Sequence, residues 1–131
     1  MHSTFLIVED NLTFRQSLRE MLEFQFPSVG IEEASNGDEA FLLLQKDKPD
    51  LIFMDIKLPG RNGLELTKTI KASNAAIDII ILTSYDIPEY RDAAIQSGAS
   101  HFFIKGNTNR DEMVDVIKST LAQRGKQYCS L

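Results

Sequence analysis

Five short runs of mainly apolar residues alternate with longer amphipathic stretches, and this alternation constrains the fold more than any other feature of the chain. Polar or turn-forming residues bound each run. Such runs are typical of strands buried on both faces, and each interval is long enough for a helix. The pattern predicts an α/β fold with five βα units and a doubly wound, five-stranded parallel sheet covered by helices on both faces. The predicted strands are Phe5–Val8, Ile31–Ala34, Leu51–Met54, Ile77–Leu82 and His101–Ile104.

Helical periodicity and capping signals place a helix in each interval. Asn36, Asn62 and Asn109 each precede a Glu by three residues, a variant of the capping box. Pro88 suits a first helical turn and Gly98 suits a helix end. Apolar residues recur at helical spacing at Phe14, Leu18, Met21 and Leu22, and again at Met113, Val116, Ile117 and Leu121. The predicted helices span residues 12–25, 37–46, 63–72, 88–97 and 110–123.

The 131 residues suit one domain, predicted over residues 1–125, with 126–131 as a short frayed tail or the start of a linker. The sequence shows neither a bilayer-length apolar run nor a secretion signal, so we expect a cytoplasmic protein without a membrane role. A net charge of −5 and the absence of a Lys/Arg cluster argue against direct nucleic-acid binding. Cys129 is expected to be an incidental thiol, and His2 and His101 are expected to be structural or solvated.

The residues that follow the predicted strands include three acids, a hydroxyl and a cation. Glu9 and Asp10 follow the first, Asp55 the third, Thr83 the fourth and Lys105 the fifth. The carboxyl ends of parallel strands meet at one edge of a sheet, where ligands bind in open α/β folds. Taken singly, these residues are more often helix caps, strand ends or solvated charges. Taken together, they predict a site.

Three carboxylates gathered at one edge repel one another, and Lys105 offsets only part of that charge. A divalent cation would offset the rest, and oxygen ligands of this kind suit Mg²⁺, which keeps waters that a phosphate can displace. Asp55 is then a candidate nucleophile toward phosphorus. Thr83 would hydrogen-bond one phosphoryl oxygen, and Lys105 would pair with another.

This order of residues, on five βα units over nearly the whole chain, resembles the receiver domain of two-component response regulators, which has a flavodoxin-like fold. The similar segments are VEDN at 8–11, MDIKLPGRNGLEL at 54–66, ILTSYD at 81–86 and GASHFFIK at 98–105. The resemblance implies that Asp55 accepts a phosphoryl group from a sensor histidine kinase, a phosphotransfer protein or a small phosphodonor. It also implies a Mg²⁺ site made by Glu9, Asp10, Asp55 and the backbone carbonyl of Lys57.

The same resemblance assigns signalling to Thr83 and Phe102, which would switch the face formed by the fourth helix, the fifth strand and the fifth helix for dimerisation or partner control. The alternative is that Phe102 and Phe103 are both core aromatics, although strand alternation points them to opposite faces. Lys57 and Tyr85 would tune water access to the phosphoryl group, or are ordinary loop residues.

Gly106 stands where many receivers have a proline, so a trans bond or a locally different loop is expected there. GASHFFIKG is similar to receivers that precede a helix-turn-helix module. A C-terminal DNA-binding effector domain outside these 131 residues is one expectation, and a stand-alone receiver with a protein partner is the other.

Two further functions compete with a signalling module that catalyses only its own phosphorylation and dephosphorylation. A metal-dependent aspartyl-phosphate phosphatase would need an acid two residues after the nucleophile, where this chain has Lys57. A degenerate receiver that binds constitutively would have no need of the acid cluster.

Overall fold

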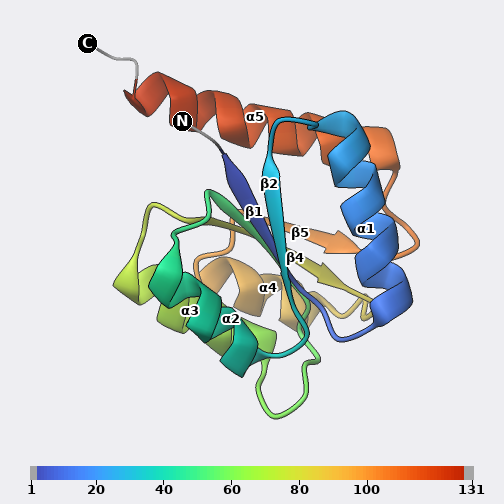
Figure 1. Ribbon diagram of the computed structural model, residues 1–131. Coiled ribbons are helices and arrows are strands. Elements are labelled where there is room, and N and C mark those ends of the chain that lie inside the picture. Colours follow the sequence, from blue (N-terminus) through green and yellow to red (C-terminus); the bar gives the residue numbers. More distant parts are fainter. Residues whose placement is uncertain (1–2, 129–131) are drawn as a thin grey trace.

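The computed structural model describes residues 3–128, with the backbone alone for residues 125–128. Five strands form one sheet in the order β2-β1-β3-β4-β5, and every neighbouring pair is parallel (Figure 1). This confirms the predicted doubly wound α/β fold. The strands are β1 (Thr4–Val8), β2 (Gly30–Ala34), β3 (Leu51–Met54), β4 (Asp78–Thr83) and β5 (His101–Ile104).

Five helices alternate with the strands and cover both faces of the sheet (Figure 1). The side chains of Asn11, Asn36 and Asn62 cap the first three helices by accepting from backbone N–H groups in the first turn. As predicted, Pro88 opens the fourth helix, and Gly98 follows its end with a φ of 104°. The helices are α1 (Leu12–Gln25), α2 (Gly37–Lys46), α3 (Gly63–Ser73), α4 (Pro88–Gln96) and α5 (Arg110–Tyr128).

Two hydrophobic clusters lie on opposite faces of the sheet. Alternation along β3 sends Ile52 and Met54 into the cluster under α2, α3 and α4, whereas Leu51 and Phe53 enter the cluster under α1 and α5. All four side chains are at most 1% exposed, and burying each stabilises the fold by about 1.5–3 kcal/mol. The central strand that leads to Asp55 is therefore held from both sides.

The sheet order reverses between β1 and β3, which is where a doubly wound fold binds ligands. Val8 and Met54 are register partners at the ends of these strands. The Asp55 N–H donates to the Val8 carbonyl at 3.1 Å, so the residues after both strands begin at the same level.

The last helix departs from the prediction. It continues to Tyr128, five residues past the predicted end at 123, so residues 126–128 of the expected frayed tail are helical. Gly125 inside a helix costs only about 1 kcal/mol, which tertiary contacts can offset. Residues 129–131, including Cys129, lie outside the described residues, as does His2.

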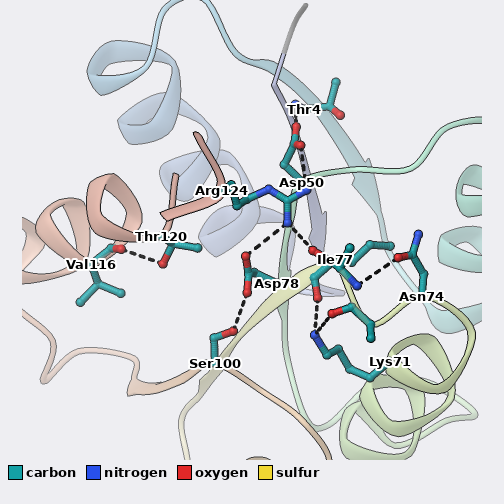
Figure 2. A network of polar contacts seen from close by, with 12 residues as sticks. Thr4, Asp50, Lys71, Asn74, Ile77, Asp78, Ser100, Val116, Thr120 and Arg124 are labelled. Atoms are coloured by element: carbon teal, nitrogen blue, oxygen red, sulfur yellow. Dashed lines mark hydrogen bonds and ion pairs between the residues drawn. The ribbon is translucent and has the colours of Figure 1, made fainter. Parts of the chain in front are cut away.

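Arg124 supplies tertiary contacts for the last turns of α5, at the amino edge of the sheet (Figure 2). Its guanidinium pairs with Asp50 at 3.1 Å and with Asp78 at 3.3 Å, and it donates to the Ala76 carbonyl. Asp50 also accepts from the Thr4 N–H. Because Asp50 precedes β3 and Asp78 begins β4, the network holds the end of α5 against two strands.

Within residues 3–128 every peptide bond is trans, including those at Gly106, where φ is 85°. This agrees with the loop expected in the absence of proline. None of the helices within this range combines the length and the apolar character needed to cross a bilayer.

Candidate functional site

The three acids predicted from the strand ends meet at the carboxyl edge of the sheet. Glu9 and Asp10 extend β1, Asp55 extends β3, and one carboxylate oxygen from each lies within 4.8 Å of the other two. Glu9 and Asp55 are only 3% and 7% exposed, whereas Asp10 is exposed. Two acids of the cluster are therefore buried, and the third, Asp10, is in contact with solvent.

Lys105 brings the opposing charge from the end of β5. Its ammonium group pairs with Glu9 and lies 3.3 Å from Oδ2 of Asp55. Its backbone N–H donates to the Thr83 carbonyl at 2.7 Å, which ties the ends of β4 and β5 together. The structure thus gathers residues that are up to 96 positions apart in the chain, from Glu9 to Lys105.

The charge of the cluster is not balanced. Burial raises the pKa of Glu9 and the nearby charge of Asp55 adds to it, while hydrogen bonds from Lys105 and the Asn11 N–H lower it; the net shift is upward. Three carboxylates facing one lysine leave excess negative charge. Because the ligand atoms that the three acids offer are all carboxylate oxygens, the acid cluster fits a hard divalent cation.

Asp55 is held with one oxygen satisfied by the backbone. Its Oδ1 accepts from the Ile56 N–H at 2.8 Å, which leaves Oδ2 beside Lys105. The chain then turns back so closely that a Cβ on Gly63 would lie 1.9 Å from the Asp55 carbonyl oxygen. Sequence reasoning missed Gly63; the available signal was a glycine directly after the capping Asn62.

Thr83 is fully buried as the last residue of β4, one position past the predicted end of that strand. Its hydroxyl oxygen accepts from the Tyr85 N–H at 3.2 Å. The start of the β4–α4 connection is therefore hydrogen-bonded to Thr83, whose hydroxyl was predicted to face a phosphoryl group.

Lys57 and Tyr85, which were predicted to share one role, lie close together in the structure. The Lys57 ammonium lies 5.6 Å from the Tyr85 ring centroid and 5.7 Å from that of Tyr90. The two rings meet edge to face at 6.1 Å. This contact joins the β3–α3 loop to α4 through cation–π interactions. Tyr90 carries no signal in the sequence that predicts this contact.

Phe102 and Phe103 point to opposite faces, as strand alternation predicts. Phe102 is 6% exposed in the cluster beneath α4, with the Arg91 guanidinium 4.8 Å from its ring centroid. Phe103 packs toward the α1 and α5 side, where the half-buried His101 stacks on it. His101 takes no part in the acid cluster.

Comparison with known proteins gives a consistent family. The family model described as the response regulator receiver domain matches residues 5–118. The chain is 36% identical over 121 residues to the chemotaxis protein CheY of Halobacterium salinarum, covering 92% of this chain and 98% of that one. It is 30% identical to the response regulator GacA of Pseudomonas aeruginosa, covering 95% of this chain and 57% of that one. The chain spans about half the length of several other regulators it matches, such as 54% of YxjL from Bacillus subtilis.

Solved structures agree with this result. A CheY-like receiver domain from Methanospirillum hungatei superposes with a TM-score of 0.88 at 25% identity, covering 97% of this chain and 99% of that one. A two-component response regulator of the LuxR family from Aurantimonas gives 0.84 at 29% identity, covering 94% and 87%. The chain therefore belongs to the response regulator receiver domain family, whose members act in phosphorylation-dependent two-component signalling.

Proposed function

We propose that Asp55 accepts a phosphoryl group from the phosphohistidine of a sensor histidine kinase or phosphotransfer protein, or from a small phosphodonor. Oδ2 of Asp55 attacks phosphorus, the bond from phosphorus to the donor atom breaks, and the donor leaves with that electron pair. The product is an acyl phosphate on Asp55. The observation that carries this proposal is the fixed Asp55 carboxylate, with Oδ1 on the Ile56 N–H and Oδ2 beside Lys105.

The protein's own residues supply the surrounding charge. Lys105 lies close enough to Asp55 to pair with an equatorial phosphoryl oxygen. Glu9, Asp10 and Asp55, with the Lys57 carbonyl, would hold Mg²⁺. The bound ion would offset negative charge on the phosphoryl group and orient it. The excess negative charge of the acid cluster supports this assignment.

Thr83 and Phe102 form the proposed switch. When the phosphoryl group is present, the Thr83 hydroxyl donates to one of its oxygens and draws the β4–α4 connection with it, because that hydroxyl already holds the Tyr85 N–H. Phe102 then changes its packing beneath Arg91. The α4–β5–α5 face is altered and becomes available to a second copy or to an effector.

Lys57 and Tyr85 are proposed to tune the lifetime of the phosphoryl group. Lys57 is exposed two residues after Asp55, and Tyr85 is 45% exposed two residues after Thr83. Held together by their cation–π contact, the two side chains limit the path of water to the acyl phosphate.

The test is to incubate the protein with acetyl phosphate and Mg²⁺ and to measure the intact mass. We expect a phosphoryl adduct that is lost in Asp55→Asn and in EDTA, and retained in Asp115→Asn, which makes the same charge change at an exposed position on α5. No adduct with any donor would contradict the proposal. Hydrolysis of many donor molecules per protein would instead indicate a metal-dependent phosphatase.

A further inference from the structure

The ammonium group of Lys105 has a neighbour that the acid cluster does not explain. The Phe14 ring lies beneath it, with its centroid 4.4 Å from Nζ. The Lys105 side chain is only 14% exposed, so this contact is largely shielded from water. Phe14 lies in the first turn of α1 and is half-buried against the cluster under α1 and α5.

A closed series of contacts holds Phe14 at this place. Lys105 pairs with one oxygen of Glu9, and the Asn11 N–H donates to the other oxygen at 3.0 Å. The Asn11 side chain accepts from the Phe14 N–H at 2.9 Å. The Phe14 ring then returns to Lys105. The start of α1 and the lysine are therefore positioned by the same four residues.

We propose that Phe14 is a positioning residue that keeps the Lys105 ammonium beside Asp55 and so sets the rate of phosphoryl transfer. The inference rests on the proposed function. A lysine side chain has four rotatable carbon bonds, and ordering it costs conformational entropy. Glu9 alone would draw the ammonium away from Asp55, whereas the ring supports it from a third direction.

An aromatic face suits this position better than another acid. The ring attracts the ammonium through its quadrupole, and the attraction strengthens when water is excluded. It carries no net charge, so it does not repel an incoming phosphoryl group.

The experiment compares Phe14→Leu, which keeps apolar packing but removes the ring, with Phe14→Tyr, which keeps it. Phe24→Leu is the matched control, because Phe24 lies on the same helix and is 81% exposed. The maximal rate of phosphorylation is measured over a range of acetyl phosphate concentrations at saturating Mg²⁺. We expect Phe14→Leu to be about three- to tenfold slower at saturation, with Phe14→Tyr and Phe24→Leu near the wild-type rate.

A second measurement needs neither phosphodonor nor Mg²⁺. NMR of the wild-type protein should show the Lys105 Cε protons shifted upfield by the ring current of Phe14, with the signal assigned through Lys105→Arg. The shift should persist in Phe14→Tyr and vanish in Phe14→Leu, while urea denaturation shows that both variants fold.

The outcomes separate this inference from the proposed function. If the wild type is phosphorylated and Phe14→Leu reacts at the same saturated rate, the inference fails alone. Absence of the ring-current shift in the wild type also overturns it. If the wild type forms no adduct, the proposed function fails first.

Discussion

Lys105 carries one positive charge against two buried carboxylates, and this imbalance is the main feature of the site at the scale of residues. The raised pKa of Glu9, caused first by burial, is one physical sign of it. Natural sites commonly retain such strain because it serves binding or chemistry, at some cost in stability.

Neutralising Asp55 should therefore stabilise the protein when no cation is present. Asn can keep the hydrogen bond from the Ile56 N–H while removing one of the two buried negative charges beside Lys105. In EDTA, we expect Asp55→Asn to raise the free energy of unfolding by about 1 kcal/mol, measured by urea denaturation. Mg²⁺ should stabilise the wild type more than the variant. An Asp55→Asn protein less stable than Asp115→Asn would contradict this account.

Gly63 is a second residue whose role comes from one close contact. A Cβ there would overlap the Asp55 carbonyl oxygen, and backbone atoms cannot move aside as a flexible side chain can. We expect Gly63→Ala to lower the free energy of unfolding by more than about 2 kcal/mol. Gly30→Ala is the matched control, because its Cβ would meet only the Thr4 side chain at 3.3 Å. Equal unfolding midpoints for the two variants would show that the turn relaxes.

At the scale of elements, charged side chains attach helices to the sheet. Arg15 and Arg19 of α1 hold Glu33 of the edge strand β2, at 2.7 Å and 2.5 Å. Burial alone would raise the pKa of Glu33, but the two guanidinium groups outweigh it and hold that pKa below its ordinary value. The contacts explain how β2, the least apolar of the five strands, keeps its place.

The sign of the pH effect follows from that lowered pKa. Stabilisation by Glu33 is present above the ordinary carboxyl value of 4.5 and is lost as the pH falls through the lower value of the folded state. Glu33→Gln should reduce the free energy of unfolding at pH 7 by about 0.5–1 kcal/mol and flatten its acid dependence. Urea denaturation between pH 3 and pH 7 gives the comparison. Glu32→Gln, at an exposed position of the same strand, should retain the wild-type slope.

Arg124 attaches the last helix in the same way. Removing its guanidinium leaves Asp50 and Asp78 without the cation between them. We expect Arg124→Met to lower the free energy of unfolding by about 1–2 kcal/mol and to speed hydrogen exchange in the final turns of α5. Lys118→Met, at an exposed position on this helix, is the control. Unchanged exchange in Arg124→Met would show that local helix propensity maintains those turns.

At the scale of the molecule, α5 runs from the carboxyl edge of the sheet to its amino edge. It begins after the loop that joins β5 to α5, and at the amino edge its Arg124 pairs with Asp50 and Asp78 (Figures 1 and 2). On the other face of the sheet, α4 covers Phe102 and leaves Ile95 57% exposed. The proposed change at Thr83 would act on the connection that leads from β4 into α4, because the Thr83 hydroxyl accepts from the Tyr85 N–H.

Dimerisation through this face can be tested with a beryllofluoride mimic of the phosphoryl group. Sedimentation velocity should show monomers converting to dimers in the wild type and no conversion in Asp55→Asn. Ile95→Asp should weaken the dimer, because a charge would replace an exposed apolar side chain on the proposed interface. Leu42→Asp, at a 62% exposed position on α2, should leave it unchanged. A wild type that stays monomeric would favour effector control over dimerisation.

Much of this protein could be predicted from local patterns. Apolar periodicity and capping signals together identify all five strands and five helices, since both depend only on residues close together in the chain. The residues that follow the strands identify Glu9, Asp10, Asp55, Thr83 and Lys105, because parallel strands bring those positions to one edge. The predicted end of α5 was wrong, because the contacts that hold its last turns join Arg124 to residues far away in the chain.

The sequence by itself therefore determined the α/β architecture and the identity of the acid, hydroxyl and lysine cluster. Only the tertiary structure decided how that cluster is supported: Phe14 beneath Lys105, Gly63 against the Asp55 carbonyl, and Lys57 beside Tyr90. The physical reason is range. Secondary structure follows from contacts between near neighbours, whereas these contacts join separate elements and depend on side-chain directions that packing alone sets.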